Sequence, residues 1–310
     1  MKQNLAFVFP GQGSQQVGML GELAGRYGII QETFKQASGA LGYDLWALAQ
    51  NGPEADLNRT DITQPALLVA GVALWRLWCA EGGPRPAQMS GHSLGEYTAL
   101  VCAGSLSLED GVRLVRLRGE AMQKAVPAGE GAMAAVLGLD DDKVEAACAE
   151  ASGQGVVAAV NYNSPGQVVI AGAAAAVALA LELCKAAGAK RAVELPVSVP
   201  SHCALMRPAA EQLAEALDRV ELIMPQCAVV QNVAAAAQAD VEAIKQNLVA
   251  QLYSPVLWTG CVNTMVAAGA ETMIECGPGK VLSGLSKRIQ RSLNVVSISD
   301  QAGLDKALGE

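Results

Sequence analysis

The sequence has little histidine, few aromatic residues and no concentration of charge. Only two of its 310 residues are histidines, His92 and His202, and aromatic residues make up 4%. Charged residues make up 17%, with a net charge of -8 and no long run of one sign, so nothing in the charge favours binding to nucleic acid or to a membrane surface. An acidic partner would need a local basic patch. The choice of a histidine for acid/base chemistry narrows to two side chains.

The sequence also lacks paired cysteine motifs and long apolar runs. Its eight cysteines are scattered, with no Cys-x-x-Cys pair and no histidine cluster of metal-ligand spacing. We therefore expect reduced thiols, no bound metal and a cytoplasmic location. The first residues lack the apolar stretch of a signal peptide. The longest apolar run, Ala171 to Leu181, is too short to span a bilayer, so neither membrane nor nucleic acid is expected as a partner.

The order of apolar segments predicts an α/β protein with a parallel sheet. Leu5 to Pro10 is typical of a buried parallel strand that leads into a glycine-rich loop. That loop has Gln16 where a dinucleotide-binding fingerprint needs its third glycine, so nucleotide binding is not expected. Helical patterns are expected at 17–41 and 64–81, and further short strands at 228–231, 272–275 and 295–298.

A separate unit is predicted in the middle of the chain. Its expected elements are a strand at 131–139, a helix at 140–151, strands at 156–162 and 167–171, a helix at 173–187 and a strand at 190–197. This order is typical of a ferredoxin-like unit. We predict a catalytic core formed by residues 1–128 and 198–310, interrupted by a ferredoxin-like subdomain at 129–197.

A candidate nucleophile, Ser93, lies in the run Gly91-His92-Ser93-Leu94-Gly95. Small residues on both sides allow the sharp strand-to-helix turn that exposes a nucleophilic serine. The flanks fit this context, with a short strand expected at 86–90 and a helix at 94–103. Ser93 would then lie at a helix N-terminus, which favours developing negative charge. The pentapeptide by itself is equally compatible with an ordinary glycine-bracketed turn.

The candidate base is His202, in a proline-marked loop at Val199 to Cys203. His92 adjoins the serine directly, and neighbouring side chains at a tight turn point in divergent directions. A satisfied structural histidine is the alternative for His202. The base also needs a group that fixes its other ring nitrogen. No carboxylate stands out for this role, and a backbone carbonyl or an amide such as that of Gln251 is left as the candidate.

Arg118 carries the most specific inference about the substrate. On a helical wheel of residues 112–126 it lies among apolar residues, away from the other charged side chains. An arginine in such a place needs an anion, because an unpaired buried guanidinium costs several kcal/mol. An internal Asp or Glu and a substrate carboxylate satisfy this requirement equally well. With a serine nucleophile nearby, the substrate carboxylate is favoured, and the acyl group itself would carry a free carboxylate.

An oxyanion hole needs two donors aimed at the carbonyl oxygen of the tetrahedral intermediate. The N–H of Leu94, directly after the nucleophile, is the expected first donor. Gln12, in the glycine-rich loop after the first strand, is the candidate for the second.

These motifs jointly resemble those of the malonyl-coenzyme A:acyl carrier protein transacylases, the free-standing malonyltransferases of bacterial fatty-acid synthesis. The resemblance covers nearly the whole chain and is specific as a set. The motifs are FVFPGQGSQ (7–15), TQPA (63–66), GHSLGEY (91–97), RG with a later methionine (118–122), NYNSPGQ (161–167), VPSHC (199–203) and GPGK (277–280).

The resemblance implies an α/β-hydrolase-like core with a ferredoxin-like insertion, and a ping-pong transfer of malonyl from malonyl-coenzyme A to holo-acyl carrier protein without a resident cofactor. Ser93 would be the nucleophile, His202 the acid/base, and Arg118 the partner of the malonyl carboxylate. The further implied roles are oxyanion-hole N–H groups at Gln12 and Leu94, a main-chain carbonyl at Gln251 that orients His202, an acyl-pocket lining position for Gln64, and substrate contacts at Met122 and Asn163.

The resemblance implies a strongly acidic carrier protein, so docking would need a basic face on this protein. Lys280, Lys287, Arg288 and Arg291 are predicted to share one side of a helix whose other side holds Leu282, Leu285 and Ile289. This side is a candidate docking surface. A solvated helix face is the simpler interpretation.

Two other functions stay open. A serine hydrolase would share all the chemistry up to the acyl-enzyme, and differs only in whether water attacks that intermediate. A non-catalytic carrier-binding scaffold is the second rival, and the joint presence of Ser93, His202 and Arg118 argues against it. The sequence also leaves methylmalonyl open as a minor substrate.

Overall fold

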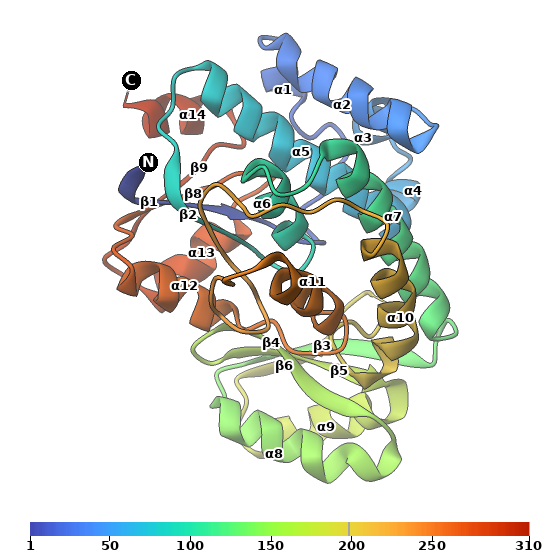
Figure 1. The fold of residues 1–310 in the computed structure, drawn as a ribbon. Helices are drawn as coiled ribbons and strands as arrows, with labels where there is room; N and C mark the ends of the chain where they lie inside the picture. Colours follow the sequence, from blue (N-terminus) through green and yellow to red (C-terminus); the bar gives the residue numbers. More distant parts are fainter. Residues whose placement is uncertain (198, 310) are drawn as a thin grey trace.

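The chain folds into a core on a parallel sheet and a smaller unit on an antiparallel sheet, as seen in a computed structural model that describes residues 1–197 and 199–309 (Figure 1). The smaller unit lies at one end of the molecule, where α8 (Asp141–Ala151) and α9 (Ala174–Ala186) form its outer layer. The α/β class predicted from the sequence is confirmed.

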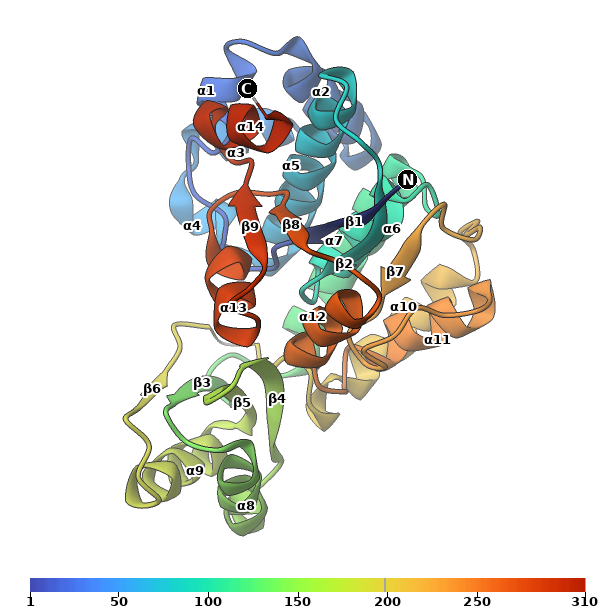
Figure 2. The same ribbon diagram turned by 90° about the vertical axis from the view of Figure 1, so that its left-hand side faces the viewer.

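The core sheet has five parallel strands with β1 in the middle. Its order is β7 (Ala228–Val230), β2 (Pro86–Gly91), β1 (Lys2–Phe9), β8 (Thr272–Glu275) and β9 (Asn294–Ser297). Residues 5–9 of β1 are buried on both faces, because helices cover the sheet on its two sides (Figure 2). This burial accounts for the continuous apolar run that predicted the strand.

Long helices pack against this sheet and against each other. The core helices are α1 (Gly21–Ala24), α2 (Gly28–Leu41), α3 (Leu45–Asn51), α4 (Glu54–Leu57), α5 (Thr60–Ala80), α6 (Gly95–Cys102), α7 (Leu108–Ala125), α10 (Arg207–Leu217), α11 (Val241–Ala250), α12 (Trp258–Ala267), α13 (Val281–Ile289) and α14 (Gln301–Leu308). By length and composition α5 passes the test for a membrane-spanning helix, and 89% of its apolar window is buried inside the protein. The helix expected at 64–81 is confirmed, and it begins four residues earlier, at Thr60.

The helical pattern expected at 17–41 forms two helices and begins later, at Gly21. The chain forms the short α1 and then α2, separated by a turn at 25–27. Leu20 before α1 has a left-handed backbone, with φ 62°, and Tyr27 before α2 is extended. Glycines at 18, 25 and 28 weaken helix propagation here, while Leu23 and Ile30 are both buried. Each piece therefore buries its own apolar residues without a continuous helix.

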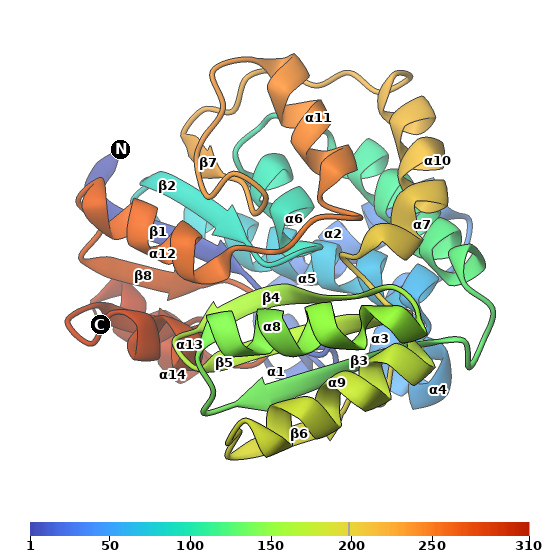
Figure 3. The ribbon, with the colours of Figure 1, turned by 90° about the horizontal axis from the view of Figure 1, so that it is seen from below.

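The smaller unit is a four-stranded antiparallel sheet covered on one face by two helices (Figure 3). Its strands are β3 (Gly131–Leu137), β4 (Val157–Ser164), β5 (Gln167–Ala173) and β6 (Arg191–Glu194), in the order β4-β5-β3-β6. The chain order strand, helix, strand, strand, helix, strand confirms the ferredoxin-like prediction. The domain limits at 128/129 and 197/198 stay a prediction, and positions 198 and 310 lie outside the described residues.

The second face of this sheet packs on the core beside the functional loop. Met133, Val160 and Val169 form an apolar cluster with Cys203, which follows His202. Val256 of the core joins β4 through two main-chain hydrogen bonds, from the Tyr162 N–H at 3.0 Å and to the Val160 carbonyl at 2.9 Å. The antiparallel sheet is thereby fixed against the site-bearing loops of the core.

Candidate active site

Ser93 is at the apex of a tight turn between β2 and α6. Its φ is 52°, in the left-handed region that residues other than glycine rarely adopt. Strained backbone of this kind persists only where the surroundings fix it. The Ser93 side chain points into a cavity, at the N-terminal end of α6. The structure therefore gives Ser93 the exposed, turn-apex geometry expected of a serine nucleophile.

The two glycines of the turn have no room for a side chain. A Cβ on Gly91 would lie 1.9 Å from the carbonyl carbon of Gly95, and a Cβ on Gly95 would lie 2.0 Å from the Phe9 carbonyl oxygen. In both cases the obstacle is backbone, which cannot rotate away. The turn brings α6 so close to β1 and β2 that only glycine fits at these two positions.

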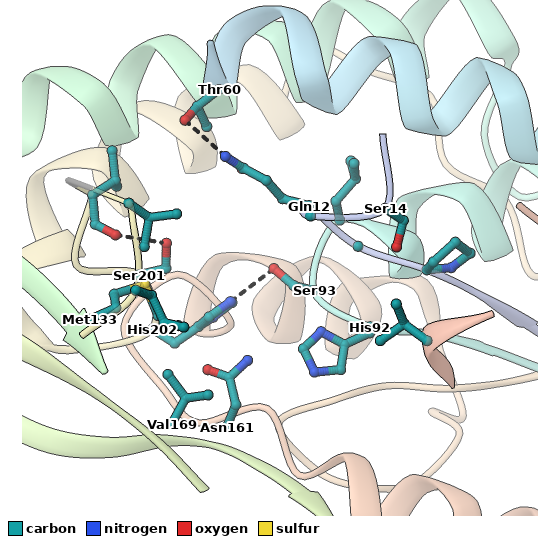
Figure 4. A pocket seen from close by; sticks show the side chains of 18 of the residues that line it. Gln12, Ser14, Thr60, His92, Ser93, Met133, Asn161, Val169, Ser201 and His202 are labelled. Atoms are coloured by element: carbon teal, nitrogen blue, oxygen red, sulfur yellow. Dashed lines mark hydrogen bonds between the residues drawn. The ribbon is translucent and has the colours of Figure 1, made fainter. Parts of the chain in front are cut away.

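His202 reaches Ser93 from a loop 109 residues away along the chain (Figure 4). Its Nε2 lies 2.8 Å from Ser93 Oγ, and its Nδ1 lies 2.6 Å from the main-chain oxygen of Gln251. That carbonyl can only accept, so Nδ1 carries the proton and Nε2 is left free to take one from the serine. The geometry is that of a serine activated by a histidine with an oriented ring.

Burial keeps His202 neutral. It is 3% exposed, and desolvation together with the positive charge of Arg118 lowers its pKa to about 3, although the hydrogen bond to Gln251 opposes the change. A neutral imidazole is the form that accepts a proton. Its φ is 65°, so the histidine and the serine are both held in left-handed backbone.

Arg118 is 1% exposed and projects from α7 toward Ser93. Its Nη2 donates to Ser93 Oγ at 3.2 Å and to Gln251 Oε1 at 3.0 Å, and its Nη1 donates to Gln64 Oε1 at 2.8 Å. Its Nε is buried without a hydrogen-bond partner in the described part of the chain. No carboxylate of residues 1–197 or 199–309 lies within 4.0 Å of this guanidinium, so the internal ion pair considered from the sequence is absent from the described residues.

Gln64 is not where the resemblance implied. It is 1% exposed and does not line the cavity, and instead it lies behind Arg118, accepting from Nη1 through Oε1 and contacting Met122 Sδ at 3.6 Å through Nε2. The two side chains come from α5 and α7, which pack against each other. Gln64 thus holds the guanidinium from behind and does not line the cavity.

The two expected oxyanion donors flank the cavity. Leu94 and Gln12 both line it. Leu94 directly follows Ser93, and Gln12 lies in the loop after β1 (Figure 4). Neither main-chain N–H donates a hydrogen bond to another of the described residues. The Gln12 side chain turns away to Thr60 Oγ1 at 3.4 Å. Both amides are therefore free to bind an oxygen atom above Ser93.

Met122 and Asn163 also line the cavity, as the resemblance implied for substrate contacts. Asn163 Oδ1 is 2.8 Å from Nε2 of His92, whose pKa is lowered by burial. His92 forms no hydrogen bond with Ser93, consistent with the divergent side chains expected at the turn.

The cavity has a volume of about 560 Å³ and lies where the two units meet. One wall comes from the core, through Ser93, Arg118 and α13, and the other from the antiparallel sheet, through Met133 and Val169. A cavity of this volume is within the range of small-molecule binding sites. Among the described residues, no three His, Cys, Asp or Glu side chains gather as metal ligands do.

The predicted basic helix face is wrong in part. Lys280 precedes α13 and pairs with Asp300 at 3.4 Å, and Arg291 follows the end of the helix. Lys287 donates to the Leu293 carbonyl, and Arg288 donates to Gln167 across the interface with the smaller unit. The helix ends at Ile289, so the four cations do not share one helical face, although all four are exposed.

Sequence reasoning missed two buried residues behind the turn. Glu96 accepts from Gln231 Nε2 at 2.9 Å and from the Asn232 N–H at 2.6 Å. Desolvation raises the pKa of Glu96 to about 7, against the hydrogen bonds and the charge of Arg118. Asn232 contacts the turn itself. The only sequence signal was the position of Glu96, three residues after the nucleophile in the motif.

The turn-apex serine, the neutral histidine and the buried arginine define an α/β serine enzyme built for acyl groups. The profile of the family described as "Acyl transferase domain" matches residues 6–304, and the chain belongs to this family. It is 57% identical over 303 residues to a "Malonyl CoA-acyl carrier protein transacylase" of Salmonella typhimurium, with 98% of each chain covered.

Solved structures agree with the family. One is a malonyl-CoA:acyl carrier protein transacylase of Xanthomonas oryzae, with 58% identity, a TM-score of 0.98 and coverage of 99% of this chain and 98% of that one. Another is a malonyl-transacylase in complex with its type II PKS acyl-carrier protein, with 53% identity, a TM-score of 0.97 and coverage of 98% and 99%.

Proposed function

We propose that this enzyme transfers a malonyl group from malonyl-coenzyme A to the phosphopantetheine thiol of holo-acyl carrier protein through a malonyl-Ser93 ester, supplying malonyl units for fatty-acid synthesis. The names of the relatives support the pair of substrates. The observation that carries the proposal is the buried Arg118, whose guanidinium lies 3.2 Å from Ser93 Oγ without a carboxylate partner among the described residues.

In the first half-reaction His202 Nε2 takes the proton of Ser93 Oγ as the oxygen attacks the thioester carbonyl carbon. The negative charge passes to the carbonyl oxygen, which faces the N–H groups of Leu94 and Gln12. When the tetrahedral intermediate collapses, the carbon–sulfur bond breaks and the coenzyme A thiolate takes the proton from His202. The products are malonyl-Ser93 and free coenzyme A.

The second half-reaction repeats these steps with the carrier thiol. His202 takes the thiol proton, the sulfur attacks the ester carbon, and Ser93 leaves with the proton from His202. The Gln251 carbonyl holds the His202 ring through both halves, because Nδ1 stays protonated throughout. These residues supply a nucleophile and a proton carrier, so we propose that no resident cofactor takes part.

Arg118 selects the acyl group. A malonyl unit carries a carboxylate on the carbon next to the thioester, within reach of a guanidinium that already contacts Ser93 Oγ. A charge-assisted, two-pronged contact is the strongest recognition a side chain offers to a carboxylate. Met122 and Asn163 are proposed to shape the remainder of the acyl site from the cavity wall.

The test is a competition between carrier and water. The protein is mixed with malonyl-coenzyme A and holo-carrier, and malonyl-carrier and free malonate are followed together. Malonyl-carrier formation that outruns hydrolysis supports transfer, and hydrolysis alone supports the hydrolase alternative. Failure of both reactions, with no effect of Ser93→Ala on carrier binding, would favour the scaffold.

The location and the docking surface are proposals as well. All eight cysteines are free thiols, which supports the reducing cytoplasm. For the acidic carrier we propose docking through the exposed cations Lys280, Lys287, Arg288 and Arg291 around α13, whose Val281 and Leu282 line the cavity.

A further inference from the structure

The Asn232 side chain forms hydrogen bonds with two residues of the nucleophile turn, Ser93 and Gly91. It lies just after β7 and is fully buried. Its Oδ1 accepts from the Ser93 N–H at 2.7 Å, and its Nδ2 donates to the Gly91 carbonyl at 2.7 Å. One side chain therefore holds the strained residue and the end of the strand that precedes it.

Glu96 fixes Asn232 in place. The Asn232 main-chain N–H donates to Glu96 Oε2 at 2.6 Å, and its main-chain carbonyl accepts from the Leu257 N–H at 3.1 Å. Glu96 belongs to α6, the helix that begins directly after the turn. The carboxylate thus connects the helix that carries the turn to the segment that holds it.

The Asn232 side chain also contacts Gln251, the residue that binds both His202 and Arg118. Asn232 Oδ1 also accepts from Gln251 Nε2 at 3.3 Å. Gln251 holds His202 through its main-chain oxygen and Arg118 through Oε1, and its Nε2 donates to the Ser93 carbonyl at 3.0 Å. Both main-chain polar groups of Ser93 are therefore bound by the Asn232 and Gln251 side chains.

Asn232 itself is not exposed to a substrate. It does not line the cavity, and its four polar groups are all occupied by protein partners. Any effect of this residue on catalysis must act through the turn. A serine does not favour left-handed backbone by itself, so the direction of Oγ depends on the contacts that hold the backbone there. These are the bonds to Asn232 and Gln251, and the Glu96 N–H donated to the Ser93 carbonyl at 3.1 Å.

We propose that Asn232 is a positioning residue for Ser93 and that Glu96 holds Asn232 in this position. The inference rests on the proposed acyl transfer through Ser93. Loss of Asn232 leaves the nucleophile, the base and the guanidinium chemically intact and frees the turn. It therefore lowers the rate of acylation and leaves the affinity for malonyl-coenzyme A unchanged.

The experiment follows malonyl-Ser93 formation by rapid quench and intact-mass measurement in the full-length chain. For Asn232→Ala we expect acylation at saturating malonyl-coenzyme A to slow by about 100-fold, the effect of a misplacement of about 1 Å at a reacting group. The half-saturating concentration stays that of the wild type. The pH dependence also keeps its position, because the bonds of His202 to Ser93 and Gln251 do not involve Asn232.

A matched control is Asn247→Ala. Asn247 Nδ2 donates to Gln231 Oε1 at 3.1 Å, in the same network, and forms no hydrogen bond with Ser93 or Glu96. This variant loses the same atoms and is expected to acylate at the wild-type rate, even where its melting temperature falls. Glu96→Ala should share the slow acylation. Glu96→Gln keeps an oxygen for the Asn232 N–H but loses the acceptor for Gln231 Nε2, and should restore part of the rate.

Wild-type acylation rates in folded Asn232→Ala, or equal slowing in Asn247→Ala, would overturn the proposal. If Asn232→Ala does not fold, the two Glu96 variants test the proposal. Acylation that is slow in Glu96→Ala and faster in Glu96→Gln supports the proposal. Identical acylation rates in the two variants overturn it. Absence of any adduct on wild-type Ser93 overturns the proposed function instead, which separates the two failures.

Discussion

The guanidinium of Arg118 contacts the oxygen of Ser93, with Nη2 at 3.2 Å from Oγ, deep inside the protein. Its other donors go to neutral amide oxygens of Gln64 and Gln251. A buried cation with only neutral partners is poised for an anion that the protein itself does not supply. This relationship assigns the acyl carboxylate its place and leads to the first prediction.

Replacing Arg118 should change which acyl group is transferred. Arg118→Met removes the charge and keeps much of the volume, so malonyl transfer is expected to fall about 10- to 100-fold, as for the loss of a hydrogen bond to a charged group of about 1.5–3 kcal/mol. Acetyl transfer should change less, because that group has no carboxylate to lose. Initial rates with the two thioesters measure this, and an unchanged malonyl preference contradicts the role of Arg118.

The same substitution should move the pH dependence of His202. The positive charge of Arg118 helps to lower the pKa of His202 to about 3, below its ordinary value of 6.5, so the base stays neutral at mildly acidic pH. Removing that charge raises the pKa, and the base becomes protonated and inactive at a higher pH than in the wild type. The acid limb of kcat/KM for acetyl-coenzyme A should therefore shift upward in Arg118→Met. An acid limb at the wild-type pH, or at a lower pH, argues against an effect of the Arg118 charge on the His202 pKa.

Glu96 should make stability depend on pH in a defined window. Its pKa is raised by burial from 4.5 to about 7, so the folded state binds the proton more tightly than the unfolded state. The stabilisation is complete below pH 4.5 and is lost as pH rises through 7. Glu96→Gln lacks this loss, so its unfolding free energy relative to wild type should increase between these two values. Urea unfolding at a series of pH values measures the difference, and a constant difference refutes the prediction.

The backbone at the turn should not tolerate a single methyl group. In Gly95→Ala the new Cβ meets the Phe9 carbonyl oxygen at 2.0 Å, so we expect a loss of about 3 kcal/mol or more, at the upper end for overpacking. Gly39→Ala is the control, since a Cβ there meets nothing within 4 Å on α2 and should stabilise the helix by roughly 0.5–1 kcal/mol. Thermal melts of both variants test this prediction. A melting temperature of Gly95→Ala equal to that of the wild type contradicts it.

Carrier docking gives a prediction about KM. Arg291→Glu reverses an exposed charge just after α13, and is expected to raise the KM for holo-carrier but not for malonyl-coenzyme A. Lys287 and Arg288 are less suitable probes. Lys287 donates to the Leu293 carbonyl, and Arg288 donates to Gln167, which lines the cavity. Equal effects on both substrates, or none, remove α13 from the docking surface.

Much of the fold could be predicted because its signals are local. The alternation of strands and helices at 131–194 follows from apolar periodicity, and the pentapeptide around Ser93 needs its two glycines for reasons confined to a few residues. The break between α1 and α2 was missed because two short apolar segments in succession resemble one long one.

The polar network behind the turn could not be predicted in this way. Asn232 is 139 residues from Ser93, and a single buried asparagine leaves no periodic pattern. Gln64 was placed on the wrong side of Arg118 for a related reason. Nearly every residue of α5 is buried, so the helix has no polar stripe to show which face meets the cavity and which meets α7.

The most direct test of the account is the intact mass of the protein after exposure to an equimolar mixture of malonyl-, acetyl- and methylmalonyl-coenzyme A. We predict a malonyl adduct as the main species on the wild type, located at Ser93 by peptide mapping and absent from Ser93→Ala. An acetyl adduct in excess of malonyl, or an adduct that survives in Ser93→Ala, would contradict the central claim that Ser93 and Arg118 together select and carry a carboxylated acyl group.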